Sequence, residues 1–195
     1  MRKSDEELME LCRRGKKKAL EELLRRYQNK LMAFIYSMVR NYHLAEDIFQ
    51  DTFIRVYRQA GRFNSEYKFK TWLYTIASNR CRDELRKMSR RPSVPVDGSG
   101  DFTGGQFEEK SPVSLADKKA GPREMAKARE FMEILEEELG GFSAEHREVV
   151  VMSRLLGLKY EEIAEVLDIP SGTVRSRLHY ALARLRERLK DKIDL

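Results

Sequence analysis

The apolar and polar positions of Tyr160–Leu189 predict two short helices joined by a tight turn. In residues 160–167 the apolar side chains are spaced to pack inward, and three glutamates remain outside. Asp168 tolerates a left-handed turn conformation, and Pro170 keeps the residue before it out of the helical region, so the first helix must end here. Ser171 then offers an N-cap for a second helix.

The second helix carries its apolar residues in one stripe that follows the helical period. This stripe consists of Val174, Leu178, Ala181, Leu182, Leu185 and Leu189. The opposite face carries Ser176, His179 and Tyr180, while Arg175 and Arg177 project to the flanks, a spacing suited to straddling a groove and reaching phosphates. Short polar residues near a helix N-terminus with flanking arginines are typical of a recognition helix in the DNA major groove.

A helical hairpin in a bundle, with its arginines solvated, is the alternative interpretation of this motif. We favour DNA binding, chiefly because the small Ala164 allows the two helices to approach closely. The run 160–178, Tyr-Glu-Glu-Ile-Ala-Glu-Val-Leu-Asp-Ile-Pro-Ser-Gly-Thr-Val-Arg-Ser-Arg-Leu, resembles the promoter-reading helix-turn-helix of bacterial sigma factors, most of all the extracytoplasmic-function (ECF) group. Its core, Gly172–Arg177, is specific to sigma factors and closely related regulators.

Helical spacing also dominates the N-terminal part of the chain. Ser4 followed by three acidic residues predicts a helix start, and a short amphipathic helix through Leu11 ends near Gly15. From Ala19 to Met38 the apolar positions keep helical spacing, which predicts a long core-facing helix. A further helix is predicted for residues 44–57, with one apolar side.

The other side of the helix 44–57 is polar. Carboxylates one turn apart, such as Asp47 and Asp51, are compatible with metal binding or acid–base chemistry. We reject that interpretation because no third ligand or histidine stands beside them, and we predict no catalytic residue, metal or cofactor. The segment 46–53, Glu-Asp-Ile-Phe-Gln-Asp-Thr-Phe, resembles the Asp-x-x-Gln-[Asp/Glu]-x-Phe signature of sigma region 2.2. The resemblance implies docking on the clamp coiled coil of the largest RNA polymerase subunit through Glu46, Asp47, Gln50 and Asp51.

Aromatic and cationic residues interleave in a predicted loop, 61–70, and a predicted helix, Thr71–Met88. They are Phe63, Tyr67, Phe69, Trp72 and Tyr74 among Arg62, Lys68, Lys70, Arg80, Arg82, Arg86 and Lys87. Stacking rings with cations that follow the backbone are typical of single-stranded nucleic-acid binding, at about 1–3 kcal/mol per stacked base. Trp72, Leu73 and Ile76 share one helical face and are expected in the core. The better contact candidates are Phe63, Asn64, Phe69, Tyr74 and Asn79.

The run 70–80, Lys-Thr-Trp-Leu-Tyr-Thr-Ile-Ala-Ser-Asn-Arg, resembles sigma regions 2.3 and 2.4, which melt the −10 promoter element and capture its non-template bases. The resemblance implies that the loop Phe63–Phe69 forms a pocket for a flipped base, returning the few kcal/mol of stacking that flipping costs. Asn79, Arg80 and Asp83 would meet the upstream edge of the element. The −10 candidates are Phe63, Asn64, Lys68, Phe69, Tyr74, Asn79, Arg80, Asp83 and Lys87.

Composition divides the chain into three parts. Residues 92–122 are rich in proline and glycine and lack apolar periodicity, which predicts a flexible linker. Stretched, such a linker reaches on the order of 100 Å, so the parts on either side can occupy DNA sites more than one helical turn apart. The flanking parts, 1–91 and 123–195, are predicted to be small helical domains because strand signals are nearly absent.

In the part 123–195 a helix is predicted from Arg123 to Leu139, stopped by two glycines, and a second one from a capping-type start at Ser143. Residues 142–150 resemble the start of sigma region 4, which also packs on the flap of the second-largest polymerase subunit.

Charge and targeting signals agree with this picture. The formal net charge is +6, and residues 1–91 hold 22 Lys and Arg against 12 Asp and Glu, which favours an anionic partner for that part. No apolar run is long enough to cross a bilayer, and the start of the chain lacks the apolar core of a signal peptide, so we expect a cytoplasmic protein. Cys12 and Cys81 are isolated and are expected to be reduced thiols rather than disulfide or zinc ligands.

We therefore expect a two-domain, all-α protein of the ECF sigma type that is not an enzyme. The resemblance implies that the C-terminal part reads the duplex −35 element and that an anti-sigma factor, through which the chain can be held at the membrane, covers both domains. The −35 candidates are Thr173, Arg175, Ser176, Arg177, His179, Tyr180 and Arg184. The alternative is a free-standing helix-turn-helix regulator that binds duplex DNA as a dimer; it needs a dimerisation or ligand domain, whereas residues 1–91 have the features of a basic single-strand binder. An enzyme acting on nucleic acid is disfavoured because its catalytic group is missing.

Overall fold

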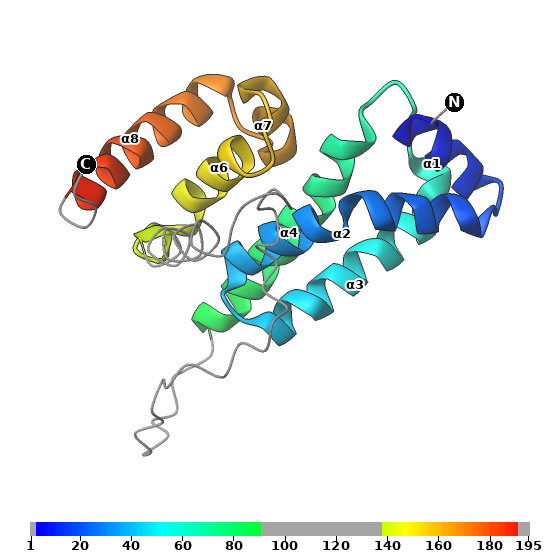
Figure 1. Cartoon of the computed structure of the whole chain (residues 1–195), viewed down its shortest axis with the longest axis horizontal. Coiled ribbons are helices and arrows are strands. Elements are labelled where there is room, and N and C mark those ends of the chain that lie inside the picture. Colours follow the sequence, from blue (N-terminus) through cyan, green and yellow to red (C-terminus); the bar gives the residue numbers. More distant parts are fainter. Residues whose placement is uncertain (1–2, 91–137, 191–195) are drawn as a thin grey trace, which may run out of the picture.

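The computed structural model describes residues 3–90 and 138–190, with side chains through Arg188, and within these ranges the only regular structure is helical (Figure 1). The N-terminal half, residues 3–90, holds α1 (Asp5–Arg13), α2 (Lys17–Val39), α3 (Tyr42–Arg58), the short 3-10 helix η1 (Ala60–Arg62) and α4 (Phe69–Arg90). The C-terminal half, residues 138–190, holds α6 (Ala144–Arg154), α7 (Tyr160–Leu167) and α8 (Ser171–Lys190). The all-α prediction is confirmed for these residues. The predicted linker and nearly all of the helix predicted for Arg123–Leu139 lie outside them.

Local sequence explains where the first helices begin and end. The Ser4 hydroxyl accepts a hydrogen bond from the Glu7 N–H at 3.1 Å, and the Glu7 carboxylate accepts one from the Ser4 N–H at 2.6 Å. This reciprocal capping satisfies two backbone donors at the predicted start of α1. Gly15, with φ 77°, supplies the left-handed turn after α1. Asn41 caps α3, because its side chain accepts from the Leu44 N–H at 2.9 Å. The helix therefore begins at Tyr42, two residues before the predicted Leu44.

The helix-turn-helix of the C-terminal half forms as the sequence predicts, with one shift. Asp168 ends α7 in a left-handed conformation, φ 53°. The N–H groups of Thr173 and Val174 donate to the Pro170 carbonyl, so Ser171 is the first helical residue of α8 rather than its cap. The apolar stripe of α8 faces the core: Val174, Leu178, Ala181 and Leu185 are buried and Leu182 is half-buried.

The start of α6 differs from the prediction. Ser143 occupies the N-cap position, but its side chain does not accept from the helix backbone; its hydroxyl lies 2.7 Å from Nδ1 of His146 instead. Arg147 of α6 donates hydrogen bonds to the last carbonyls of α2, at Ser37 and Met38.

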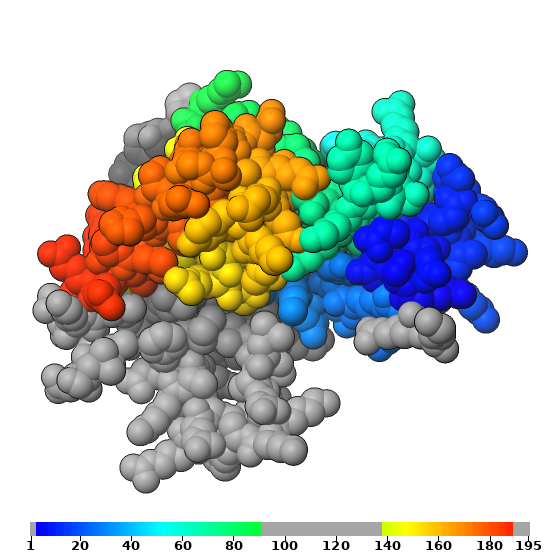
Figure 2. Space-filling view, turned by 90° about the horizontal axis from the view of Figure 1, so that it is seen from above, coloured from blue at the N-terminus to red at the C-terminus, as the bar shows by residue number. Residues whose placement is uncertain are grey.

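The two halves pack against each other. Helix α7 lies on α4, and α6 lies on the end of α2, so that buried side chains from both halves form one continuous cluster (Figure 1). Figure 2 shows the C-terminal half directly beside the loop that precedes α4. Segments far apart in the sequence therefore meet at the surface that the sequence predicts to bind nucleic acid.

Candidate nucleic-acid interface

A half-open hollow of about 290 Å³ lies at the loop before α4. Its N-terminal-half lining is supplied by η1, the loop and the first turns of α4, through Arg62, Phe63, Asn64, Tyr67, Thr71, Trp72 and Thr75. The rings of Phe63 and Trp72 lie 5.1 Å apart between centroids, and Tyr67 is exposed. Aromatic faces beside hydrogen-bonding groups and an arginine make a site suited to an unpaired base, since every base offers a π-face for stacking.

Two of the predicted −10 contacts are wrong. Phe69 and Tyr74 are 0% exposed and belong to the core, where Phe69 packs edge-on against Tyr27 at 5.4 Å and Tyr74 against Phe34 at 5.5 Å. Trp72, predicted to lie in the core, is half-buried: it packs against the core and also lines the hollow. Phe69 is buried because α4 starts at this residue, two residues before the predicted Thr71, which places Phe69 on the same face as Leu73 one turn later.

The remaining −10 candidates lie at or near the surface. Asn64 and Lys68 are exposed in the loop, and Asn79, Asp83 and Lys87 are exposed along α4. Arg80 is engaged inside the N-terminal half: its Nε lies 2.6 Å from a carboxylate oxygen of Asp51, and it also pairs with Glu84 at 3.3 Å.

The polar face predicted to bind polymerase is formed by α3. Asp47 and Gln50 are exposed, and Glu46 and Asp51 are half-buried. Burial acts to raise the pKa of Asp51, but Arg55, which donates to it at 2.8 Å, and Arg80 outweigh that effect and hold the pKa below its ordinary value. Asp51 is thus a charged link between α3 and α4. Large apolar side chains, Ile54 and Tyr57, are exposed on the same helix.

The predicted recognition surface of α8 is available to solvent. Arg175, Ser176, His179 and Tyr180 are exposed, Tyr180 by 54%. Three candidates are partly engaged within the C-terminal half: Thr173 and Arg177 are half-buried, with Arg177 paired to Glu145 at 2.9 Å, and the Arg184 guanidinium lies 5.4 Å from the ring centroid of Phe142.

Helix α7 reaches the hollow from the C-terminal half. Glu165 contributes to its lining, and the Lys68 ammonium donates to Glu162 at 2.5 Å. This hydrogen bond lowers the pKa of Glu162, so the carboxylate is held in its charged form. Next to it, Lys70 donates to the Leu156 carbonyl at 2.9 Å. Acidic side chains of the C-terminal half therefore lie against the hollow and against the loop that precedes α4.

A buried polar cluster joins the halves at Glu148 of α6. This side chain is 1% exposed and accepts from the Ser78 hydroxyl and from Nη2 and Nε of Arg82, at 2.9 and 3.1 Å. Burial raises the pKa of Glu148 and outweighs the attraction of Arg82 and, further away, of Arg177. We call Ser78, Arg82 and Glu148 the seam cluster.

Arg147 holds a second contact between the halves. Its guanidinium donates to the Met38 carbonyl at 2.9 Å, in the last turn of α2, and to the carbonyls of Leu139 and Phe142, each at 3.0 Å. A cation at a helix C-terminus satisfies carbonyls that have no partner within the helix and complements the helix dipole.

Sequence reasoning did not single out Glu148, Arg147 or the glutamates of α7. A charged residue directly before the apolar run Val149-Val150-Val151 is a usable signal for Glu148, since charged residues are seldom buried without a partner. The partner itself lies 66 positions away and is not readable from local pattern.

Other chemistry finds no support in the described residues. Among them no three His, Cys, Asp or Glu side chains lie close enough to hold a metal, and no helix is both long and apolar enough to cross a bilayer. Cys12 and Cys81 are free and buried, and burial raises the pKa of both thiols.

Comparison with known proteins identifies both halves. Residues 23–91 match the family Sigma-70 region 2, and residues 132–185 match Sigma-70, region 4. The chain is 32% identical to the ECF RNA polymerase sigma-E factor of Haemophilus influenzae, over 98% of this chain and 96% of that protein. It is 34% identical to the RNA polymerase sigma factor CarQ of Myxococcus xanthus, over 93% and 95% of the two chains.

Solved structures share the fold. CnrH in complex with the cytosolic domain of CnrY matches with a TM-score of 0.68 at 22% identity, over 98% of this chain and 100% of that one. RpoE of Bartonella quintana, in complex with the anti-sigma factor NepR, matches with a TM-score of 0.63 at 24% identity, over 90% and 98%. With two matching regions and relatives aligned along nearly the whole chain, the protein belongs to the ECF group of the sigma-70 family.

Proposed function

We propose that this chain binds core RNA polymerase, recognises the −35 and −10 elements of a promoter and promotes melting of the DNA for transcription initiation. The relatives named above are RNA polymerase sigma factors. The observation that carries the proposal is the hollow at Phe63, Asn64 and Trp72, because an open, ring-lined site beside cations suits an unpaired base and not an intact duplex.

The division of labour follows from the two surfaces. The exposed face of α8 carries Arg175, Ser176, His179 and Tyr180 for the duplex −35 element, with Thr173, Arg177 and Arg184 at its edge. The hollow, together with Lys68, Asn79, Arg80, Asp83 and Lys87, receives the melted −10 strand. The face of α3 at Glu46, Asp47, Gln50 and Asp51 docks on the clamp of the largest polymerase subunit, and the C-terminal half meets the flap of the second-largest. The protein acts in the cytoplasm, where an anti-sigma factor covers it and can hold it at the membrane.

Promoter binding requires the two halves to separate. As long as α7 lies on α4, Glu162 occupies Lys68 and Glu165 narrows the hollow. The −10 and −35 surfaces must also part to reach elements that lie more than a helical turn apart on DNA.

Transcription with core polymerase on a promoter library tests the proposal. The wild-type chain should create start sites absent with core enzyme alone. Phe63→Ala should reduce open-complex formation while polymerase affinity holds, since it removes a stacking face. A chain that does not co-elute with core polymerase and binds only duplex DNA would instead be a free-standing regulator.

A further inference from the structure

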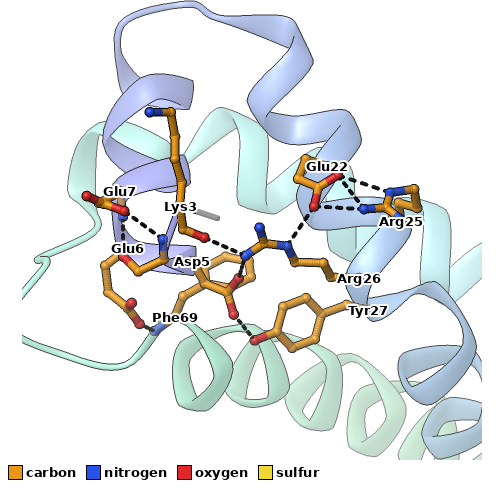
Figure 3. A network of polar contacts seen from close by, with 10 residues as sticks. Lys3, Asp5, Glu6, Glu7, Glu22, Arg25, Arg26, Tyr27 and Phe69 are labelled. Carbon is orange, nitrogen blue, oxygen red and sulfur yellow. Dashed lines mark hydrogen bonds and ion pairs between the residues drawn. The ribbon is translucent and has the colours of Figure 1, made fainter. Parts of the chain in front are cut away.

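Helix α1 reaches the loop before α4 from outside the matched region 2, which begins at residue 23. A carboxylate oxygen of Glu6 accepts a hydrogen bond from the backbone N–H of Phe69 at 3.0 Å (Figure 3). Phe69 is the first residue of α4, so this N–H is one of those that the helix itself cannot satisfy. Glu6 thus caps α4 from a different helix, separated from it by 63 positions in the sequence.

The neighbouring residue of α1, Asp5, contacts Tyr27, which packs against Phe69. Asp5 accepts from the Tyr27 hydroxyl at 2.5 Å and pairs with Arg26 at 2.6 Å, which ties α1 to α2 (Figure 3). Tyr27 in turn packs edge-on against the Phe69 ring. Glu6 therefore holds the backbone of Phe69 directly, and Asp5 acts on its ring only through Tyr27.

Phe69 transmits this position to the hollow. Its ring is buried behind Phe63 and Trp72, with centroids 6.1 and 6.2 Å away, and these two rings line the site. A small shift of the first turn of α4 would move both stacking faces, because close-packed rings transmit displacement.

We propose that Glu6 is a positioning residue for capture of the melted strand: by capping α4 at Phe69, it sets the separation and tilt of Phe63 and Trp72 in the base-binding hollow. The inference rests on the proposed function of that hollow. Glu6 does not contact DNA; it acts through the backbone of Phe69, and its effect falls on strand binding rather than on polymerase or −35 binding.

Two substitutions of Glu6 separate the effect of side-chain length from the effect of charge. Glu6→Gln keeps an oxygen at the same distance along the side chain but removes the charge, whereas Glu6→Asp keeps the charge and withdraws the oxygens by one methylene. The full chain, assembled with core polymerase, is titrated with a labelled single-stranded oligonucleotide selected from a random pool by the wild-type complex. Polymerase affinity, duplex −35 binding and thermal unfolding are measured on each variant.

Glu6→Asp should weaken strand binding by about two- to thirtyfold, the range that corresponds to loss of a helix cap, while Glu6→Gln stays close to wild type. Glu10→Gln is the matched control, because Glu10 lies one turn further along α1 and pairs with Arg13 and Arg14 instead. Strand binding by Glu6→Asp equal to wild type, or a loss in Glu6→Gln alone, overturns the inference. So does an equal loss of polymerase affinity, which indicates general damage to the domain.

Phe63→Ala distinguishes failure of this inference from failure of the proposed function. If Phe63→Ala weakens strand binding and Glu6→Asp does not, the hollow binds the strand but Glu6 does not position it. If Phe63→Ala leaves strand binding unchanged, the hollow is not the strand site, and the proposed function of the hollow falls together with the inference.

Discussion

Removing Arg82 should open the chain. Arg82 is the only cation that donates to Glu148 among the described residues, and its side chain is 27% exposed while that of Glu148 is 1% exposed. In Arg82→Ala the carboxylate is left buried with one neutral partner, the Ser78 hydroxyl. Separation of the halves lets water solvate the carboxylate, so the closed arrangement loses stability and the open one does not.

The magnitude follows from the burial of the remaining charge. Removal of one partner from a buried ion pair costs about 3–5 kcal/mol, and the lower end applies because Arg82 itself is partly solvated. Each 1.4 kcal/mol is a factor of ten, so the ratio of closed to open chains should fall by about a hundredfold. This loss exceeds anything expected from the surface pairs around it.

The assay is energy transfer between one dye on each half, for example on α1 and on the exposed side of α8, in the free chain. Arg82→Ala should lower transfer strongly, and Arg86→Ala should not, because Arg86 is 71% exposed and pairs with Asp83 only at 3.9 Å. Adding Glu148→Gln to Arg82→Ala should restore closure in part, since the amide carries no charge to be stranded. Transfer in Arg82→Ala equal to wild type, or a double variant as open as the single one, would refute the reasoning.

Three further outcomes are expected. Glu162→Gln should raise the affinity of the free chain for single-stranded DNA modestly and in a salt-sensitive way, because it releases Lys68. Glu161 is the exposed neighbour on α7, so Glu161→Gln should leave this affinity unchanged, and equal gains in both variants would assign the effect to net charge alone. Tyr74→Phe should leave strand binding unchanged and keep or raise the free energy of unfolding by about 1 kcal/mol in thermal melts, because the buried Tyr74 hydroxyl has no hydrogen-bond partner in the described structure; a loss of strand binding would return Tyr74 to the contact set. The closed form binds the proton of Glu148 more tightly than the open form, because burial raises the pKa of this carboxyl above its ordinary value of 4.5. The wild-type chain should therefore open progressively as the pH rises from 4.5 through the raised pKa. Glu148→Gln should remove this pH dependence, and the same pH profile in both chains would assign the dependence to another group.

Local chemistry was enough to predict where α1 begins and where α7 ends. Ser4 with Glu7 starts α1, and Asp168 before Ile169-Pro170 ends α7 in a left-handed turn, because both depend on side chains within three or four positions. The same holds for the stripe of α8, where a residue's face follows from the 3.6-residue period alone.

The faces at the start of α4 could not be predicted in this way. The helix begins two residues earlier than predicted, which brings Phe69 onto the buried face of α4, and that start is stabilised by Glu6 from α1, a contact across 63 positions. The burial of Tyr74 has the same origin, since Phe34 and Tyr27 on α2 cover it.

The sequence alone determined the helical class, the two unlike surfaces and the family resemblance, since helix periodicity, caps and charged motifs are encoded by neighbouring residues. Only the tertiary structure decided which aromatic rings face the hollow. It also decided that acidic side chains of α7 lie against the hollow. Those outcomes depend on packing and on contacts between residues far apart in the sequence, such as Glu6 with Phe69 and Lys68 with Glu162, which form only when distant helices meet.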